Sequence, residues 1–178
     1  FSIGNIFLAC NYCIHIKSNK MKKLILMVAI FATAFVQQTF AQNNSTPQPS
    51  ELLTSYYNIK DALVNVDANK AAVNAEQFVK TLKNISIETV GESNKEALIK
   101  DAGKISVTKD LNKQREYFSA FSANMYALAK TVKLSSEPVY YQYCPMKKAT
   151  WLSSNKTIKN PYFGSAMLTC GRTTETLQ

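Results

Sequence analysis

The chain has 178 residues, 46% of them hydrophobic, which suits one ordinary domain with a buried core and argues against a second domain. Its 21 basic residues exceed its 12 acidic ones, so the formal net charge is +9 at pH 7. The lysines are dispersed among acidic residues, without an arginine-rich or aromatic-interleaved strip, and this pattern argues against nucleic-acid binding.

Residues 21–41 have the pattern of a secretory signal peptide. Met21-Lys22-Lys23 leads into an apolar run, 24–32, that is too short to span a bilayer, and Ala41 provides a small residue at the cleavage position. We therefore expect cleavage between Ala41 and Gln42, export to the periplasm, and no membrane span in the mature protein.

Residues 1–20 contain no methionine and precede a complete signal peptide. We interpret them as a non-native upstream extension, with the native start at Met21; an extended leader is the alternative, and both leave the mature chain unchanged. This interpretation removes the chain's only histidine, His15, and also Cys10 and Cys13, whose C-x-x-C spacing is then not a redox motif. The extension and the signal peptide together contain four of the 21 basic residues, so the net charge of the mature chain is expected to be +5.

Residues 42–50 are polar, with two prolines, and are expected to form a flexible linker to a single domain, 51–178. In that domain two segments first show apolar residues at helical spacing, and we expect Asp67 to cap the second of them. The first segment carries Leu52, Leu53, Tyr56, Ile59, Leu63 and Val66. The second carries Ala71, Ala75, Phe78, Val79 and Leu82.

Two further helices are expected before residue 133. Ser93 and Glu96 have the spacing of a capping box, which predicts a helix that starts at Ser93. The fourth helix is expected to start near Thr108 and to carry an apolar stripe interrupted only by Gln114. The stripe consists of Leu111, Phe118, Phe121, Met125, Leu128 and Val132. Such a stripe is more often core than a cofactor-binding face.

The pattern changes after Pro138. Residues 139–143 are aromatic and β-prone, and the threonine-rich tail, 172–177, is suited to pair with them. Asn160-Pro161 and Phe163-Gly164 predict turns between the two segments. The sequence thus predicts a mainly α fold: a four-helix up-and-down bundle with a small C-terminal appendix of β or irregular structure.

Four sulfur-containing residues lie in or beside this appendix: Cys144, Met146, Met167 and Cys170. Cys144 and Met146 would share one face of a strand, and Met167 and Cys170 one face of a helical turn. Thiolates and thioethers select Cu(I), so these four residues are candidate ligands of a soft metal ion. Trp151 is a candidate cover for such an ion by cation–π contact.

A disulfide is the alternative use of the same cysteines. In an oxidising compartment Cys144 and Cys170 would pair, and the bond would stabilise the fold by about 3 kcal/mol in the chain-entropy model. Met146 and Met167 would then be packing residues, and Trp151 part of a small satellite core.

Enzymatic chemistry is disfavoured. The chain after residue 42 lacks the histidine that Ser-His-Asp, Cys-His and the usual zinc hydrolase sites require. It also lacks a glycine-rich phosphate-binding loop. We therefore expect a protein that is not an enzyme.

Several segments carry a family resemblance: 60–63, 112–118, 139–146, 151–153, 160–164 and 167–171. Together they resemble an uncharacterised family of domains of unknown function that is found in Gram-negative envelope proteins, alone or appended to Cus-type copper-efflux adaptors. The resemblance implies a part in copper or other heavy-metal handling, with an efflux adaptor or another envelope protein as partner.

Two functional hypotheses follow from these observations. The first is an exported Cu(I)-binding protein that assists envelope copper or heavy-metal efflux. The second is a structural or interaction module that docks on an envelope partner, with Cys144 and Cys170 joined in a disulfide.

Overall fold

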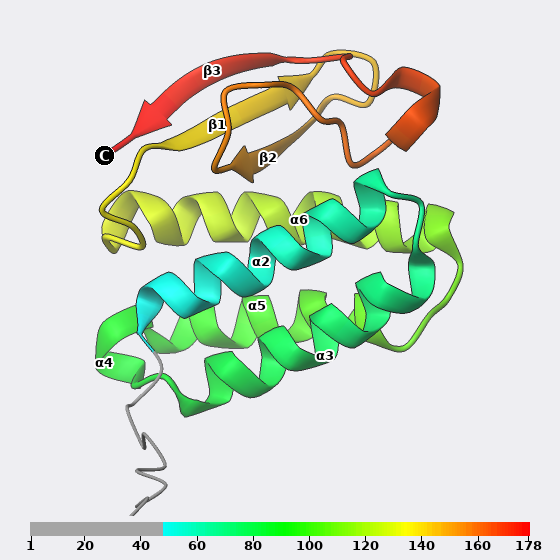
Figure 1. Cartoon of the computed structure of the whole chain (residues 1–178). Helices are drawn as coiled ribbons and strands as arrows, with labels where there is room; N and C mark the ends of the chain where they lie inside the picture. Colours follow the sequence, from blue (N-terminus) through cyan, green and yellow to red (C-terminus); the bar gives the residue numbers. More distant parts are fainter. Residues whose placement is uncertain (1–47) are drawn as a thin grey trace, which may run out of the picture. The chain divides into compact units, whose positions relative to one another are not determined.

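The computed structural model describes residues 48–178, which form a mainly helical domain with a small C-terminal sheet, as the sequence predicted (Figure 1). The expected signal peptide, the upstream extension and most of the 42–50 linker lie outside the described residues. Pro49 and Ser50, expected in the linker, belong to the first helix. The helices are α2 (Pro49–Val64), α3 (Ala68–Asn84), α4 (Ile87–Val90), α5 (Glu92–Ser106) and α6 (Leu111–Thr131).

The four longer helices pack in chain order, with α2 against α3, α3 against α5, and α5 against α6. The remaining helix, α4, has only four residues and was not predicted from the sequence. It lies directly before α5, which it contacts. No helix within residues 48–178 combines the length and the apolar character needed to cross a membrane.

Capping was predicted correctly for α3 and wrongly for α5. Asp67 caps α3, because its side chain accepts a hydrogen bond from the Lys70 N–H at 2.9 Å. Ser93 is not a cap. It lies inside the first turn of α5, whose N-cap is Gly91, a residue with a φ of 78° that few other residue types adopt.

The last long helix, α6, begins at Leu111, three residues after the expected start near Thr108. Asp110 is its N-cap and accepts hydrogen bonds from two N–H groups of the first turn at 2.9 and 3.3 Å. Gln114 interrupts the apolar stripe yet is fully buried, and its Nε2 donates to the carbonyl of Ala68 at 2.8 Å. The prediction of a buried stripe is confirmed for Phe118, Phe121, Met125 and Leu128, which are all 0% exposed.

The sheet has three antiparallel strands: β1 (Val139–Cys144) lies between β2 (Ala149–Ser153) and β3 (Arg172–Leu177). The predicted strand and its predicted pairing with the C-terminal tail are both confirmed. β2 was not predicted. It contacts α6, so the sheet forms a layer over the helices, and the 154–171 segment with its short helix η1 (Gly164–Met167) connects β2 to β3 (Figure 1).

Tyr56 joins the helices to the sheet. Its ring centroid lies 5.6 Å from that of Phe118 and 5.5 Å from that of Phe121. Its hydroxyl lies 2.7 Å from Ser122 Oγ and accepts a hydrogen bond from the Leu152 N–H of β2 at 3.0 Å. Burial raises the pKa of the Tyr56 phenol far above its ordinary value, so the hydroxyl stays neutral.

Replacing Tyr56 with phenylalanine is expected to lower the free energy of unfolding by about 1–3 kcal/mol, because the buried Leu152 N–H and Ser122 hydroxyl lose their partner. Tyr57→Phe is the matched control. Among the described residues the buried Tyr57 hydroxyl has no hydrogen-bond partner, so its loss should be neutral or slightly stabilising. Urea denaturation of the two variants measures both changes, and equal losses would contradict this role of Tyr56.

Candidate metal centre

A pair of thiols lies at one end of the sheet. Cys144 is the last residue of β1, and Cys170 is separated from β3 only by Gly171. Their Sγ atoms are 3.6 Å apart and both thiols are free. An S–S bond is about 2.05 Å long, so the sulfurs are close but not bonded. Cys144 is fully buried and Cys170 is half-buried, which leaves the pair open to solvent from one side.

Asn160 organises the segment that carries Cys170. The Asn160 side chain is fully buried, and its Nδ2 donates to the Cys170 carbonyl at 2.7 Å. Its Oδ1 accepts from the Tyr162 N–H at 2.8 Å, and its own N–H donates to the Leu168 carbonyl at 2.8 Å. Sequence reasoning used Asn160 only as a turn signal, because the Asn-Pro pair indicates a turn but not what the amide binds.

The two thiols differ in acidity. Burial acts to raise the pKa of the Cys144 thiol, but hydrogen bonds from the Lys147 backbone, the Asn160 side chain and Cys170 outweigh it, so this pKa is lowered. The pKa of Cys170 is raised, chiefly by its hydrogen bond to Cys144. When the pair ionises, Cys144 therefore loses its proton before Cys170, and the thiolate is the form that binds metals and attacks disulfides.

The two methionines lie on exposed segments beside the thiols. Met146 is in the turn between β1 and β2 and is 66% exposed. Because β1 ends at Cys144, Met146 does not share a strand face with Cys144, contrary to the prediction. Met167 ends η1, is 38% exposed, and accepts through its carbonyl a hydrogen bond from the Cys170 N–H at 3.1 Å. The β1–β2 turn and η1 lie at the same end of the sheet (Figure 1).

Trp151 is a fully buried residue of β2. It is paired in register with Gln142 of β1, and its ring meets that of Tyr162 edge to face at a centroid distance of 6.1 Å. Its Cη2 lies against Gly171, where a Cβ atom would come within 2.8 Å of it. The indole is thus packed beneath the segment that carries Cys170. A cation–π contact between Trp151 and a bound metal ion stays a prediction.

The donor set fits a soft ion better than a hard one. Among residues 48–178 no three histidine, cysteine, aspartate or glutamate side chains are grouped to hold a metal, so more than two protein ligands would require the thioethers. Two sulfurs each about 2.3 Å from a tetrahedral ion are about 3.8 Å apart, close to the 3.6 Å between Cys144 and Cys170.

The fold and site define a mainly helical domain that carries a free cysteine pair on a small C-terminal sheet. Residues 52–137 match the model of a family described as "Protein of unknown function (DUF3347)". The match begins in the first turn of α2, extends past the end of α6 and stops two residues before β1, so the sulfur residues lie beyond it. Searches of curated proteins and of solved structures found no match.

Proposed function

We propose that the protein is an exported, non-enzymatic protein of the periplasm that binds Cu(I) as cargo and assists envelope copper or heavy-metal efflux. Cys144 and Cys170 are the central ligands in this proposal, with Met146 and Met167 completing the site and Trp151 covering it. The long helices, taken as an up-and-down bundle, are the scaffold. An efflux adaptor is the partner that would receive the ion.

The observation that carries the proposal is the thiol pair, with Sγ atoms 3.6 Å apart and a lowered pKa at Cys144. A thiolate beside a second sulfur is a ready ligand pair for a soft cation, and no protein carboxylate or imidazole is needed to complete it. The exposed methionines suit a cargo site because a solvent-facing thioether lets an ion enter and leave.

Replacing both Met146 and Met167 with leucine should preserve the fold and weaken Cu(I) binding by at least about tenfold. Leucine keeps the apolar volume but has no donor atom. The loss of even an outer-shell partner of a metal commonly costs about tenfold or more in affinity. Titration of Cu(I) against a competing chelator, under reducing and oxygen-free conditions, measures the change.

Met125→Leu is the matched control. It makes the same methionine-to-leucine change at a residue of α6 that is buried in the core and is not a proposed ligand. Its Cu(I) affinity should equal that of the wild type. Equal affinities in the wild type and in the Met146/Met167 variant would exclude the methionines as ligands.

The disulfide-stapled interaction module is the second candidate, and the short Sγ–Sγ distance favours it as well. The bond would close a loop from the end of β1 to the start of β3 and stabilise the domain by about 3 kcal/mol. Mass spectrometry of protein purified without reductant, before and after anaerobic addition of Cu(I), separates the candidates. A mass lower by two hydrogens, with no copper uptake after reduction, would favour the module.

A further inference from the structure

A cavity of about 640 Å³ lies between the first turns of α6, the β1–β2 turn and the segment around η1. Three basic side chains, Lys113, Arg115 and Lys147, line it together with the aromatic rings of Tyr162 and Phe163. Glu116 is the one acidic residue among the described residues that line it, and none of them contains sulfur. The volume lies within the range of small-molecule sites, about 300–1,000 Å³. The cavity therefore shares no lining residue with the candidate metal centre, but it adjoins it, because Lys147 follows Met146 and Ala166 precedes Met167.

Arg115 is held in place by backbone atoms. Its Nε donates to the Pro161 carbonyl at 3.0 Å, and its Nη2 donates to the Leu63 carbonyl at the end of α2 at 3.3 Å. Three segments singled out in the sequence, 60–63, 112–118 and 160–164, thus meet at this one side chain. Gly164 packs so closely that a Cβ atom there would lie 2.8 Å from Nη2.

Glu116 offsets only part of the positive charge of the three basic side chains that line the cavity. Within residues 48–178 neither Arg115 nor Lys113 nor Lys147 forms an ion pair. The guanidinium of Arg115 has five N–H groups, and two of them donate to the Pro161 and Leu63 carbonyls. Three N–H groups remain for another acceptor. A fixed guanidinium with free donors beside two lysines is suited to a carboxylate or phosphate group.

We infer that this cavity binds an oxyanion ligand, a carboxylate- or phosphate-bearing small molecule with an apolar or aromatic body. The anionic group pairs with Arg115 and the two lysine ammonium groups, and the body packs against Phe163. Both lysines are exposed and neither forms an ion pair with the described residues, so each can be replaced without disturbing the fold.

Calorimetric titrations with citrate, inorganic phosphate and phenyl phosphate at low ionic strength test the inference. Saturable binding of at least one probe is expected, tightest for phenyl phosphate if the ring packs on Phe163. In Lys113→Gln/Lys147→Gln the affinity should fall at least about tenfold, because two charge-assisted contacts are lost.

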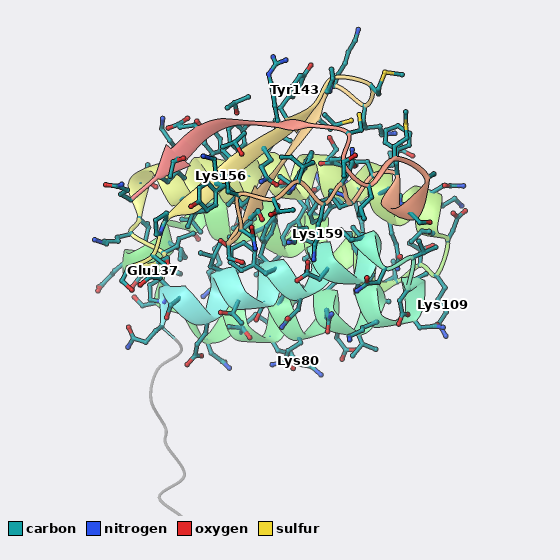
Figure 2. The ribbon with its side chains drawn as sticks, turned by 45° about the horizontal axis from the view of Figure 1, so that its top comes forward. Lys80, Lys109, Glu137, Tyr143, Lys156 and Lys159 are labelled. Carbon is teal, nitrogen blue, oxygen red and sulfur yellow. The ribbon has the colours of Figure 1, made fainter. Side chains whose placement is uncertain are left out.

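Lys80→Gln is the control, since this exposed lysine of α3 lies on the side of the molecule away from the sheet (Figure 2). It should bind the probes as the wild type does, and circular dichroism should show the same fold in all three proteins. Equal affinity in the double variant, or no saturable binding of any of the three probes, would overturn the inference. Cu(I) binding should be unchanged in Lys80→Gln.

Discussion

Replacing Phe121 with alanine is expected to lower the free energy of unfolding by about 3–5 kcal/mol. The side chain is 0% exposed. Its ring meets that of Phe78 edge to face at a centroid distance of 4.8 Å, and it lies 5.5 Å from the ring of Tyr56. These contacts join α6 to α3 and α2, so the cavity left by the substitution is walled by three helices and cannot collapse easily. Urea denaturation followed by circular dichroism measures the loss.

Val73→Ala provides the comparison, because Val73 lies on α3 and is 64% exposed. Its effect should stay within about 0.5 kcal/mol. A loss of less than about 1 kcal/mol for Phe121→Ala would mean that the helices repack around the missing ring. The α6 stripe would then not be the centre of the core.

The long helices could be predicted from the sequence because each buries one face, so that its apolar residues recur at helical spacing. Spacing of three and four residues identified the α6 stripe, which is buried even around Gln114. Short-range signals were less reliable. The Ser93 capping box has the right residues, yet the chain turns two residues earlier at Gly91, where the four-residue helix α4 ends. A helix of that length has no periodicity from which to predict it.

β2 was missed for a different reason. Three consecutive residues, Trp151, Leu152 and Ser153, are buried, so the strand lacks the alternation of apolar and polar residues that marks a half-exposed strand. Leu152 donates its N–H to Tyr56 of α2, whereas Trp151 packs against Gly171 of the covering segment. Both faces of the strand are covered, and only the tertiary structure reveals this.

The candidate site was predicted in part. The structure brings Cys144 and Cys170 together because β1 and β3 pair, and that pairing was expected from the sequence. Met146 was expected on a strand that ends two residues before it. The part played by Asn160 depends on contacts with Cys170 and Leu168 that no local pattern encodes. The basic cavity at Arg115 was missed because its residues come from three distant segments.

Gly171→Ala is expected to destabilise the domain by at least about 2 kcal/mol and to disturb the site beside it. Gly171 has a φ of 152°, which disfavours other residues. A Cβ atom there would lie 2.8 Å from Trp151 Cη2 and 3.0 Å from the Tyr143 carbonyl. The methyl group must therefore displace the indole or move β3 away from β1, and either shift moves the adjacent Cys170.

The effect on the site can be measured apart from the effect on stability, because Trp151 is the chain's only tryptophan and its fluorescence reports on this region alone. Gly103→Ala is the matched control: Gly103 lies within α5, and a Cβ atom there has no neighbour within 4 Å. That change should stabilise the domain by about 0.5–1 kcal/mol and leave the fluorescence unchanged. Gly171→Ala should shift the emission and lower stability in the same titration. If it instead behaves like Gly103→Ala, Trp151 is not packed tightly beneath the segment that carries Cys170, and the close contact between the indole and Gly171 does not constrain the site.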